Sequence, residues 1–142
     1  MTRIPALAPL LLLTACSGAT GLEPGSRRVV GVIDVGSQSL RALAAPDTVA
    51  AGAPFVVTVT TFGSSSCTRA DGAEVEVRGL VAEVVPYDRE ATGARVCTDD
   101  LRPFPRDVTV RFSAPGQATV RALGRGLGGG AAVVEARVVV RP

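Results

Sequence analysis

The stretch Asp107-Val108-Thr109-Val110-Arg111-Phe112-Ser113-Ala114-Pro115-Gly116-Gln117-Ala118-Thr119-Val120 sets the expectation for the fold. Apolar and polar side chains alternate on both sides of a Pro-Gly turn, and a period of two is typical of half-buried strands. The apolar residues of each arm fall on one face. The stretch therefore predicts two strands joined as a hairpin through residues 113–116.

The same pattern recurs along the chain. The clearest further strand covers residues 55–62, and residues 73–78 alternate so that Val75 and Val77 point inward. Other strands are expected at residues 29–35, 40–45, 80–85 and 133–140, with loops at residues 63–72 and 87–106. Pro86 is expected to end the strand before it. Seven or eight short strands, with no helix after the N-terminal segment, predict an all-β fold of the antiparallel β-sandwich type.

Two of these segments resemble bacterial Ig-like domains. Residues 51–55 contain a Gly-x-Pro entry into a strand, and residues 112–120 contain an apolar-Pro-Gly turn. The resemblance covers roughly residues 40–140 and implies an Ig-like sandwich. The cysteines at positions 67 and 97 lie in predicted loops, so a disulfide between them would staple loops instead of pinning two sheets together.

The N-terminus contains Leu13-Thr14-Ala15-Cys16 after an apolar run of about ten residues, which is short for a membrane span. This stretch resembles the lipobox of bacterial lipoproteins. The resemblance implies a signal peptide at residues 1–15, a lipid on Cys16 and anchoring in the cell envelope, and Ser17 favours the outer membrane. Residues 16–28 then form a flexible linker and residues 29–142 the domain. An ordinary secretory signal and a buried apolar segment are the alternatives.

The interpretation of the three cysteines depends on that resemblance. If Cys16 carries lipid, the remaining two of the three cysteines are Cys67 and Cys97. Outside the cytoplasm, a disulfide between them is expected. It would stabilise the domain by roughly 3–4 kcal/mol through its effect on the unfolded chain. Two free buried thiols remain the alternative.

Composition narrows the function classes. The formal net charge is only +2, which argues against a nucleic-acid partner because such binding needs a dense basic face. The chain has no histidine and no lysine, so the usual Ser-His-Asp, Cys-His, Ser-Lys and Schiff-base chemistries are excluded. We therefore expect a protein that is not an enzyme and uses no cofactor.

Two motifs would indicate nucleotide or phosphate chemistry instead. Residues 124–129 have the glycine spacing of a dinucleotide-binding loop, but a β-branched strand follows them where a helix is required, so a hairpin loop is favoured. Residues 32–41, with Asp34, resemble the phosphate-contacting turn of the exopolyphosphatase and sugar-kinase superfamily. That superfamily needs two large α/β domains, so a strand ending in a polar turn is favoured here.

The predicted loop at residues 87–106 is the remaining candidate for binding. Asp99 and Asp100 are weak candidates for calcium ligands, with salt-bridged decoration as the alternative. Tyr87 and Phe104 flank the loop and would form either a contact surface or a cap on the core. The sequence thus favours a non-catalytic structural or interaction module whose partner is an envelope protein or a glycan. The alternative is a small-ligand, glycan or calcium-binding module, and the oligomeric state stays open.

Overall fold

The structure is a computed structural model that describes residues 25–36, 41–93 and 96–142. These residues form ten β-strands and no helix, so the predicted all-β fold is confirmed with more strands than expected. The strands are β1 (Ser26–Val30), β2 (Val32–Asp34), β3 (Leu43–Ala44), β4 (Thr48–Ala50), β5 (Pro54–Gly63), β6 (Thr68–Arg78), β7 (Val81–Ala91), β8 (Arg102–Arg111), β9 (Gly116–Gly126) and β10 (Ala131–Arg141).

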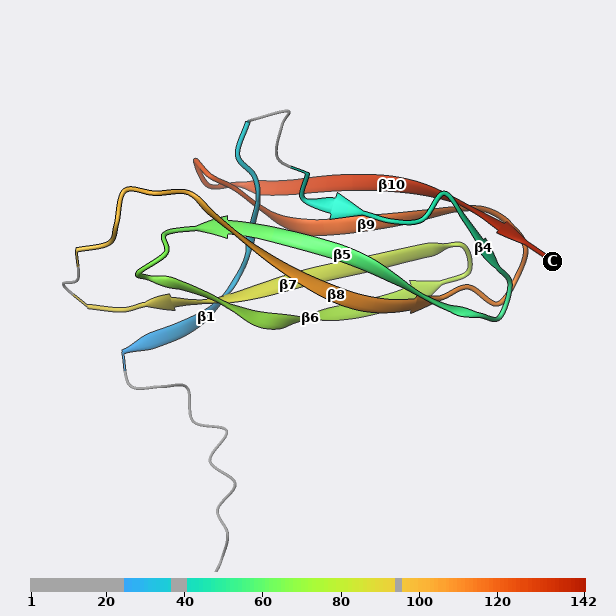
Figure 1. The fold of residues 1–142 in the computed structure, drawn as a ribbon, viewed down its shortest axis with the longest axis horizontal. Coiled ribbons are helices and arrows are strands. Elements are labelled where there is room, and N and C mark those ends of the chain that lie inside the picture. The colour runs from blue at the N-terminus through green and yellow to red at the C-terminus, as the bar shows by residue number, and fades with distance from the viewer. Residues whose placement is uncertain (1–24, 37–40, 94–95) are drawn as a thin grey trace, which may run out of the picture.

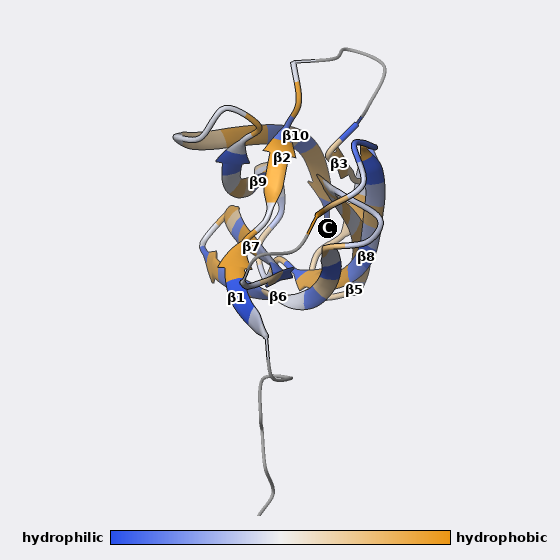
Figure 2. Ribbon diagram, turned by 90° about the vertical axis from the view of Figure 1, so that its left-hand side faces the viewer, coloured by the Kyte–Doolittle hydropathy of each residue, from blue (hydrophilic) through white to orange (hydrophobic). Residues whose placement is uncertain are grey.

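The strands form two layers around a common interior, in a sandwich-like arrangement (Figures 1 and 2). The first layer contains β6, β7, β9 and β10 in that order, with β1 paired to β7 and β4 paired to β10. The second layer contains β3, β5 and β8, with β5 in the middle. The short strand β2 pairs with β9 and with β5, so it joins the two layers into one hydrogen-bonded sheet.

The sheet is mixed, which corrects the expectation of a purely antiparallel sandwich. Three strand pairs are parallel, namely β7 with β9, β2 with β9, and β4 with β10. Parallel neighbours need a crossover connection between them. Here β8, which lies in the other layer, connects β7 to β9.

The predicted hairpin at residues 107–120 is wrong, although the alternation that suggested it is confirmed. The inward-facing residues of both arms are buried: Val108, Val110, Phe112, Ala118 and Val120. However, β8 pairs with β5 and β9 pairs with β7 and β10, so the two arms lie in different layers. The Pro-Gly turn at residues 113–116 instead connects one layer to the other. The alternation shows that each arm buries one face, but it does not show which strand lies beside that arm.

The core fills the space between the layers. Its best-packed members are valines together with Phe62 and Phe112, and the ring of the partly buried Phe55 lies 5.7 Å from that of Phe112. The fully buried large side chains include Val57, Val59, Phe62, Val84, Val110, Phe112, Val120 and Val138. Because β-branched residues pack well on a pleated surface, the valine-rich composition suits this arrangement.

Gly31 divides the strand that was expected over residues 29–35. A Cβ at this position would lie 2.2 Å from Thr61 Cγ2 and 2.8 Å from Asp88 Oδ2, so only glycine fits where the chain crosses from β7 towards β5. The preceding strand β1 begins at Ser26. Residues 26–28, which were assigned to the flexible linker, therefore belong to the sheet.

Pro86 does not end its strand, because β7 continues to Ala91. Proline has no N–H, so it is tolerated in a sheet only where a ladder bond is already missing. On one side of Pro86, β6 bulges between Ala70 and Ala73. On the other side, the Gly31 N–H donates to the Pro86 carbonyl at 2.8 Å, in the gap between β1 and β2.

The two predicted loops are correspondingly shorter than expected. Strand β6 begins at Thr68, which leaves residues 64–67 as the loop after β5. Strands β7 and β8 take up both ends of the predicted loop at residues 87–106, which leaves residues 92–101 between them.

Val75 and Val77 point inward as predicted but remain partly exposed. They lie opposite Val84 and Ala82 of β7, both of which are fully buried. Val75 and Val77 each keep 39% of their surface exposed because β6 is at the edge of its layer.

Candidate functional site

The predicted disulfide between Cys67 and Cys97 is present. It joins the residue just before β6 to the segment between β7 and β8, with a Cα–Cα distance of 5.6 Å and an S–S distance of 2.07 Å. The Ala91 N–H donates to the Cys67 carbonyl at 2.9 Å, so backbone pairing supports the same junction. Cys97 is exposed and Cys67 is half-buried. The bond is a loop staple at the surface, as the sequence suggested.

Hydroxyl groups from the two stapled loops converge on Thr98. Its Oγ1 lies 2.8 Å from Ser64 Oγ, 3.1 Å from Ser65 Oγ and 3.3 Å from Ser66 Oγ. The Thr98 N–H also donates to Ser66 Oγ at 2.9 Å. The serine run is thus a polar bridge between loops.

Asp100 completes this bridge from the same side. Its carboxylate accepts hydrogen bonds from Thr98 Oγ1 at 2.5 Å, from the Ser65 N–H at 3.0 Å and from Arg102 Nε at 3.1 Å. These donors, with Thr98 first and Ser65 next, hold the pKa of Asp100 far below its ordinary value. A carboxylate with so low a pKa is a weak general base at neutral pH, so it cannot activate the neighbouring hydroxyls.

The calcium hypothesis placed Asp99 and Asp100 together as ligands. Asp99 is exposed, whereas Asp100 is engaged by the donors of the bridge. Among the described residues, no group of three or more histidine, cysteine, aspartate or glutamate side chains could hold a metal ion. The geometry of this loop therefore does not favour a calcium site.

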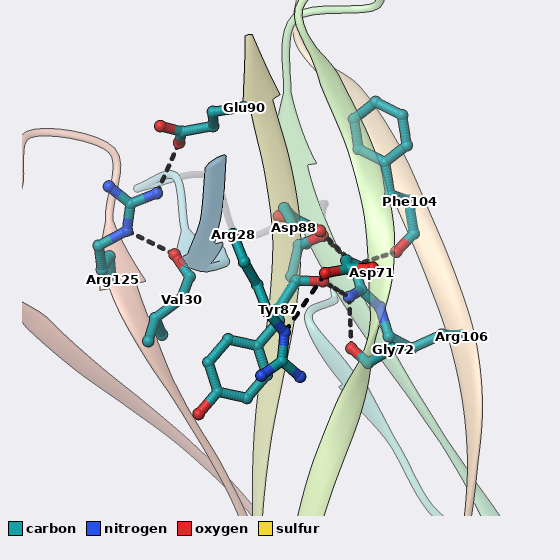
Figure 3. A network of polar contacts seen from close by, with 11 residues as sticks. Arg28, Val30, Asp71, Gly72, Tyr87, Asp88, Glu90, Phe104, Arg106 and Arg125 are labelled. Atoms are coloured by element: carbon teal, nitrogen blue, oxygen red, sulfur yellow. Dashed lines mark hydrogen bonds and ion pairs between the residues drawn. The ribbon is translucent and has the colours of Figure 1, made fainter. Parts of the chain in front are cut away.

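Tyr87 and Phe104 do not form one contact surface. Their rings point away from each other, one on each side of the Arg106 guanidinium (Figure 3). Arg106 links them only through their backbones, because it donates to the Tyr87 carbonyl and, at 3.3 Å, to the Phe104 carbonyl. Both side chains are half-buried.

Arg106 belongs to a buried polar group that the sequence did not reveal, which we call the seam latch: Arg106, Asp88 and Thr61. Arg106 Nη2 lies 2.6 Å from Asp88 Oδ1, and Thr61 Oγ1 donates to the same oxygen at 2.8 Å. The exposed fraction of the side chain is 9% for Arg106 and 2% for Asp88. A buried charge needs a partner and hydrogen bonds, and each charge here has both, although the buried Arg106 Nε has no hydrogen-bond partner.

The seam latch ties three strands together at the open side of the sandwich. Thr61 comes from β5, Asp88 from β7 and Arg106 from β8. Arg106 Nη1 also donates to the Gly72 carbonyl of β6 at 2.8 Å (Figure 3). One guanidinium thus closes the gap between β6 and β8, where no strand ladder exists within the described residues.

On the outer face of the first layer, a second polar group holds β1 beside β7. The Arg28 guanidinium lies 3.6 Å above the centre of the Tyr87 ring, and it pairs with Glu74 at 3.1 Å and with Asp71 at 3.3 Å. The Arg28 hydrogen bond, and then the Tyr87 hydroxyl, lower the pKa of Glu74. Desolvation, and then the hydrogen bond to Glu74, raise the pKa of Tyr87.

Arg125 adds a further contact to β1. Its guanidinium donates to the Val30 carbonyl at 2.5 Å and pairs with Glu90 at 2.7 Å (Figure 3). Glu90 also pairs with Arg27 at 3.4 Å. Three partly exposed ion pairs and a cation–π contact therefore fasten a strand that contributes no buried residue.

The two motif matches lie side by side. The Leu127 N–H, in the glycine-rich loop, donates to the Asp34 carbonyl at 2.8 Å, and the Gly36 N–H donates to Asp34 Oδ1 at 2.9 Å. Strand β10 follows the glycine-rich loop and pairs with β9, so the favoured hairpin is confirmed. Asp34 ends strand β2 and turns the chain, while residues 37–40 of the second motif lie outside the described residues.

The lipobox residues and Cys16 also lie outside the described residues. Within the described ranges, no helix is long and apolar enough to cross a membrane. Comparison with protein-family models, with curated proteins and with solved structures gives no match to this chain.

Proposed function

We propose that the protein is a lipid-anchored protein of the bacterial cell envelope that presents a non-catalytic, sandwich-like β domain for interaction with another macromolecule. The anchor rests on the resemblance of Leu13-Thr14-Ala15-Cys16 to a lipobox. The observation that carries the proposal in the structure is the Cys67–Cys97 disulfide at the domain surface. A solvent-accessible disulfide persists in an oxidising compartment, which supports a location outside the cytoplasm.

The proposed anchor bounds the distance between the domain and the membrane. Nine residues separate Cys16 from Ser26, the first residue of β1. A fully extended chain of this length reaches about 35 Å. The Thr92 N–H donates to the Gly25 carbonyl at 2.7 Å, so the disulfide-stapled loops lie at the end of the domain where the linker enters. The opposite end, with the C-terminus in Figure 1, is then directed away from the anchor.

A non-catalytic role agrees with the chemistry of the candidate site. The hydroxyl cluster around Thr98 has no strong base beside it, because the chain has no histidine and no lysine, and the pKa of Asp100 is lowered. Its hydrogen bonds join two loops. The seam latch likewise engages its own charges and is buried.

The anchor is tested by mass spectrometry of the protein purified from bacterial membranes. We expect an N-terminal peptide that begins at Cys16 and carries two or three acyl chains. A Cys16→Ala variant should lose the lipid and leave the membrane fraction. An intact N-terminus, or cleavage elsewhere in the unaltered protein, would overturn the anchor.

The interaction role is tested with the tagged full-length protein, cross-linked in intact cells and recovered from solubilised membranes. We expect one envelope component to be captured reproducibly, with the matched Cys16→Ala protein as the control for anchor-dependent background. Equal recovery of every abundant envelope protein by both forms would contradict a specific interaction.

A further inference from the structure

Strand β6 has two halves with different surroundings. Among the described strands it pairs only with β7, so its other edge carries no ladder. The bulge between Ala70 and Ala73 separates the halves. The first half is held by the Arg106 guanidinium, which donates to the Gly72 carbonyl at 2.8 Å. The second half, residues 73–78, lies beyond the latch, and we call it the free half of β6.

The free half is unusually exposed for a strand. Residues 74–78 are all exposed, and the side chains of Glu76 and Arg78 keep 58% and 73% of their surface in contact with solvent. Val75 and Val77 add a partly exposed apolar face towards the interior. Natural edge strands are protected by charged side chains, inward-pointing charges, prolines or bulges. Residues 73–78 carry Glu74, Glu76 and Arg78 on the outer face but no proline, no bulge and no inward-pointing charge.

The charges of the free half are unbalanced within the sheet. Glu76 lies directly opposite Glu83 of β7, and like charges in that position repel. Arg78, which pairs with Glu76 at 2.6 Å, lies opposite the uncharged Val81. Arg121 pairs with Glu83 at 3.5 Å, so each of the two carboxylates has one arginine partner, and a second arginine on the open side of Glu76 would offset the remaining repulsion.

We propose that the free half of β6 pairs antiparallel with the same segment of a second copy of this chain, in the register centred on Val77. In this register Val77 faces its own copy and the new ladder covers residues 76–78, because Gly79 lies in the turn after β6. Glu76 of each copy then faces Arg78 of the other, so each Glu76 gains a second arginine neighbour. Unpaired N–H and C=O groups of both edges form a new ladder.

Charge selects this register over its neighbours. A two-fold axis perpendicular to the sheet pairs residues that lie on the same face, so the centre is a residue. The centres that leave at least three facing residues within the free half are Glu74, Val75, Glu76 and Val77. Centring on Glu74 or on Glu76 places that carboxylate against its own copy. Centring on Val75 places Glu74 against Glu76, again two like charges. Only the centre at Val77 brings opposite charges together at every charged position it pairs.

A second copy of the chain is thus a partner for the proposed interaction role. The pairing rests on the proposed function only in that both copies are anchored in the same membrane. Strand β6 runs from the stapled loops towards the turn before Val81, so the free half lies in the part of the domain farther from the linker (Figure 1). Anchored copies share one membrane plane, and this arrangement raises their effective concentration for an edge contact that is weak in solution.

The test uses cysteine cross-linking of the full-length chain in a bacterial host. Directly opposite residues of an antiparallel pair have Cα atoms about 4.5–5.5 Å apart, which suits a disulfide. Val77→Cys should therefore give a dimer on a non-reducing gel. Val133→Cys, exposed to 52% on β10 and away from this edge, should stay monomeric. Equal dimer from both variants, or none from Val77→Cys, would overturn the inference.

Charge reversal then tests the register in the Val77→Cys background. Glu76→Arg alone and Arg78→Glu alone should each reduce the dimer about tenfold, because two pairs become like-charged. Co-expressed with different tags, these two variants should form the mixed dimer, since each supplies the charge that the other lacks. The double variant Glu76→Arg/Arg78→Glu should restore the dimer within one chain, which shows that the single variants fold.

The outcomes separate this inference from the anchor. A dimer recovered in the soluble fraction would remove the anchor and keep the pairing. Membrane-bound monomer would keep the anchor and overturn the pairing. Adducts between Val77→Cys and an unrelated envelope protein, without dimer, would assign the edge to a strand of that partner and overturn the second copy. Dimer that ignores the charge variants would overturn the register.

Discussion

Replacing Asp88 with asparagine tests whether the seam latch holds the two layers together. Asp88 is 2% exposed and accepts hydrogen bonds from Arg106 at 2.6 Å and from Thr61 at 2.8 Å. Asparagine keeps the shape but removes the charge, so the Arg106 guanidinium stays buried without its counter-ion. Breaking one partner of such a buried pair costs about 3–5 kcal/mol.

That cost is a large part of the stability of a domain of this size, which is about 5–15 kcal/mol. The melting temperature should fall by roughly 10–20 °C. The measurements are thermal unfolding for the melting temperature and urea unfolding for the free energy, both on the purified protein and followed by far-ultraviolet circular dichroism. Glu83→Gln is the matched control, because Glu83 pairs with Arg121 at 3.5 Å at a partly exposed site. That exposed pair is worth less than about 1 kcal/mol.

A double-mutant cycle decides whether the loss comes from the pair. Arg106→Met removes the guanidinium, so adding Asp88→Asn to it should cost at least about 2 kcal/mol less than adding Asp88→Asn to the unaltered protein. Additive losses, or a loss below about 1 kcal/mol for Asp88→Asn alone, would refute the reasoning. In that case the gap between β6 and β8 would be held by the apolar core alone.

Three further predictions concern other parts of the same region. Gly31→Ala should destabilise the domain in thermal unfolding because the new Cβ meets Thr61 Cγ2, and Thr61→Ser should recover part of the loss since it removes that methyl group but leaves the contact with Asp88 Oδ2; no recovery would place the strain elsewhere. Replacing Cys67 and Cys97 together with serine should lower the unfolding free energy by about 3–4 kcal/mol in urea titration, and an unchanged midpoint would contradict a stabilising staple. Asp100 has a lowered pKa in the folded protein, so its stabilising effect is full above its unfolded pKa of about 3.9 and is lost as the pH falls through the folded pKa. Unfolding measured between pH 5 and pH 2 should therefore show a weaker pH dependence for Asp100→Asn than for the unaltered protein, and parallel curves would contradict this assignment.

The period-two pattern predicted which faces are buried better than it predicted which strands are neighbours. Residues 107–120 illustrate the difference, because the alternating side chains are buried as expected while the two arms pair with other strands. Burial depends on the local alternation of side chains, which a sequence displays directly. Strand pairing depends on contacts between distant segments, and one Pro-Gly turn fits both a hairpin and a corner between layers.

The stapled loops were partly predictable and the seam latch was not. Cysteine arithmetic pointed to Cys67 and Cys97 because only one pair remained after the lipobox cysteine was set aside. Thr61, Asp88 and Arg106 come from three strands and share no spacing, so no local motif marks them. The one available signal was a charged residue at an inward position of a strand, as Asp88 is two residues after the buried Pro86 and four after the buried Val84.

The features that interrupt the strands meet at one place and explain why one edge is left open. Gly31, Pro86 and the bulge at Gly72 are adjacent interruptions, and Arg106 donates into the gap that they leave. A single guanidinium reaches only the carbonyls beside it, so it secures the first half of β6 and not the second. The sheet is therefore closed near the stapled loops and open over residues 73–78. An edge that is closed by one side chain instead of a ladder leaves its remaining N–H and C=O groups for another strand.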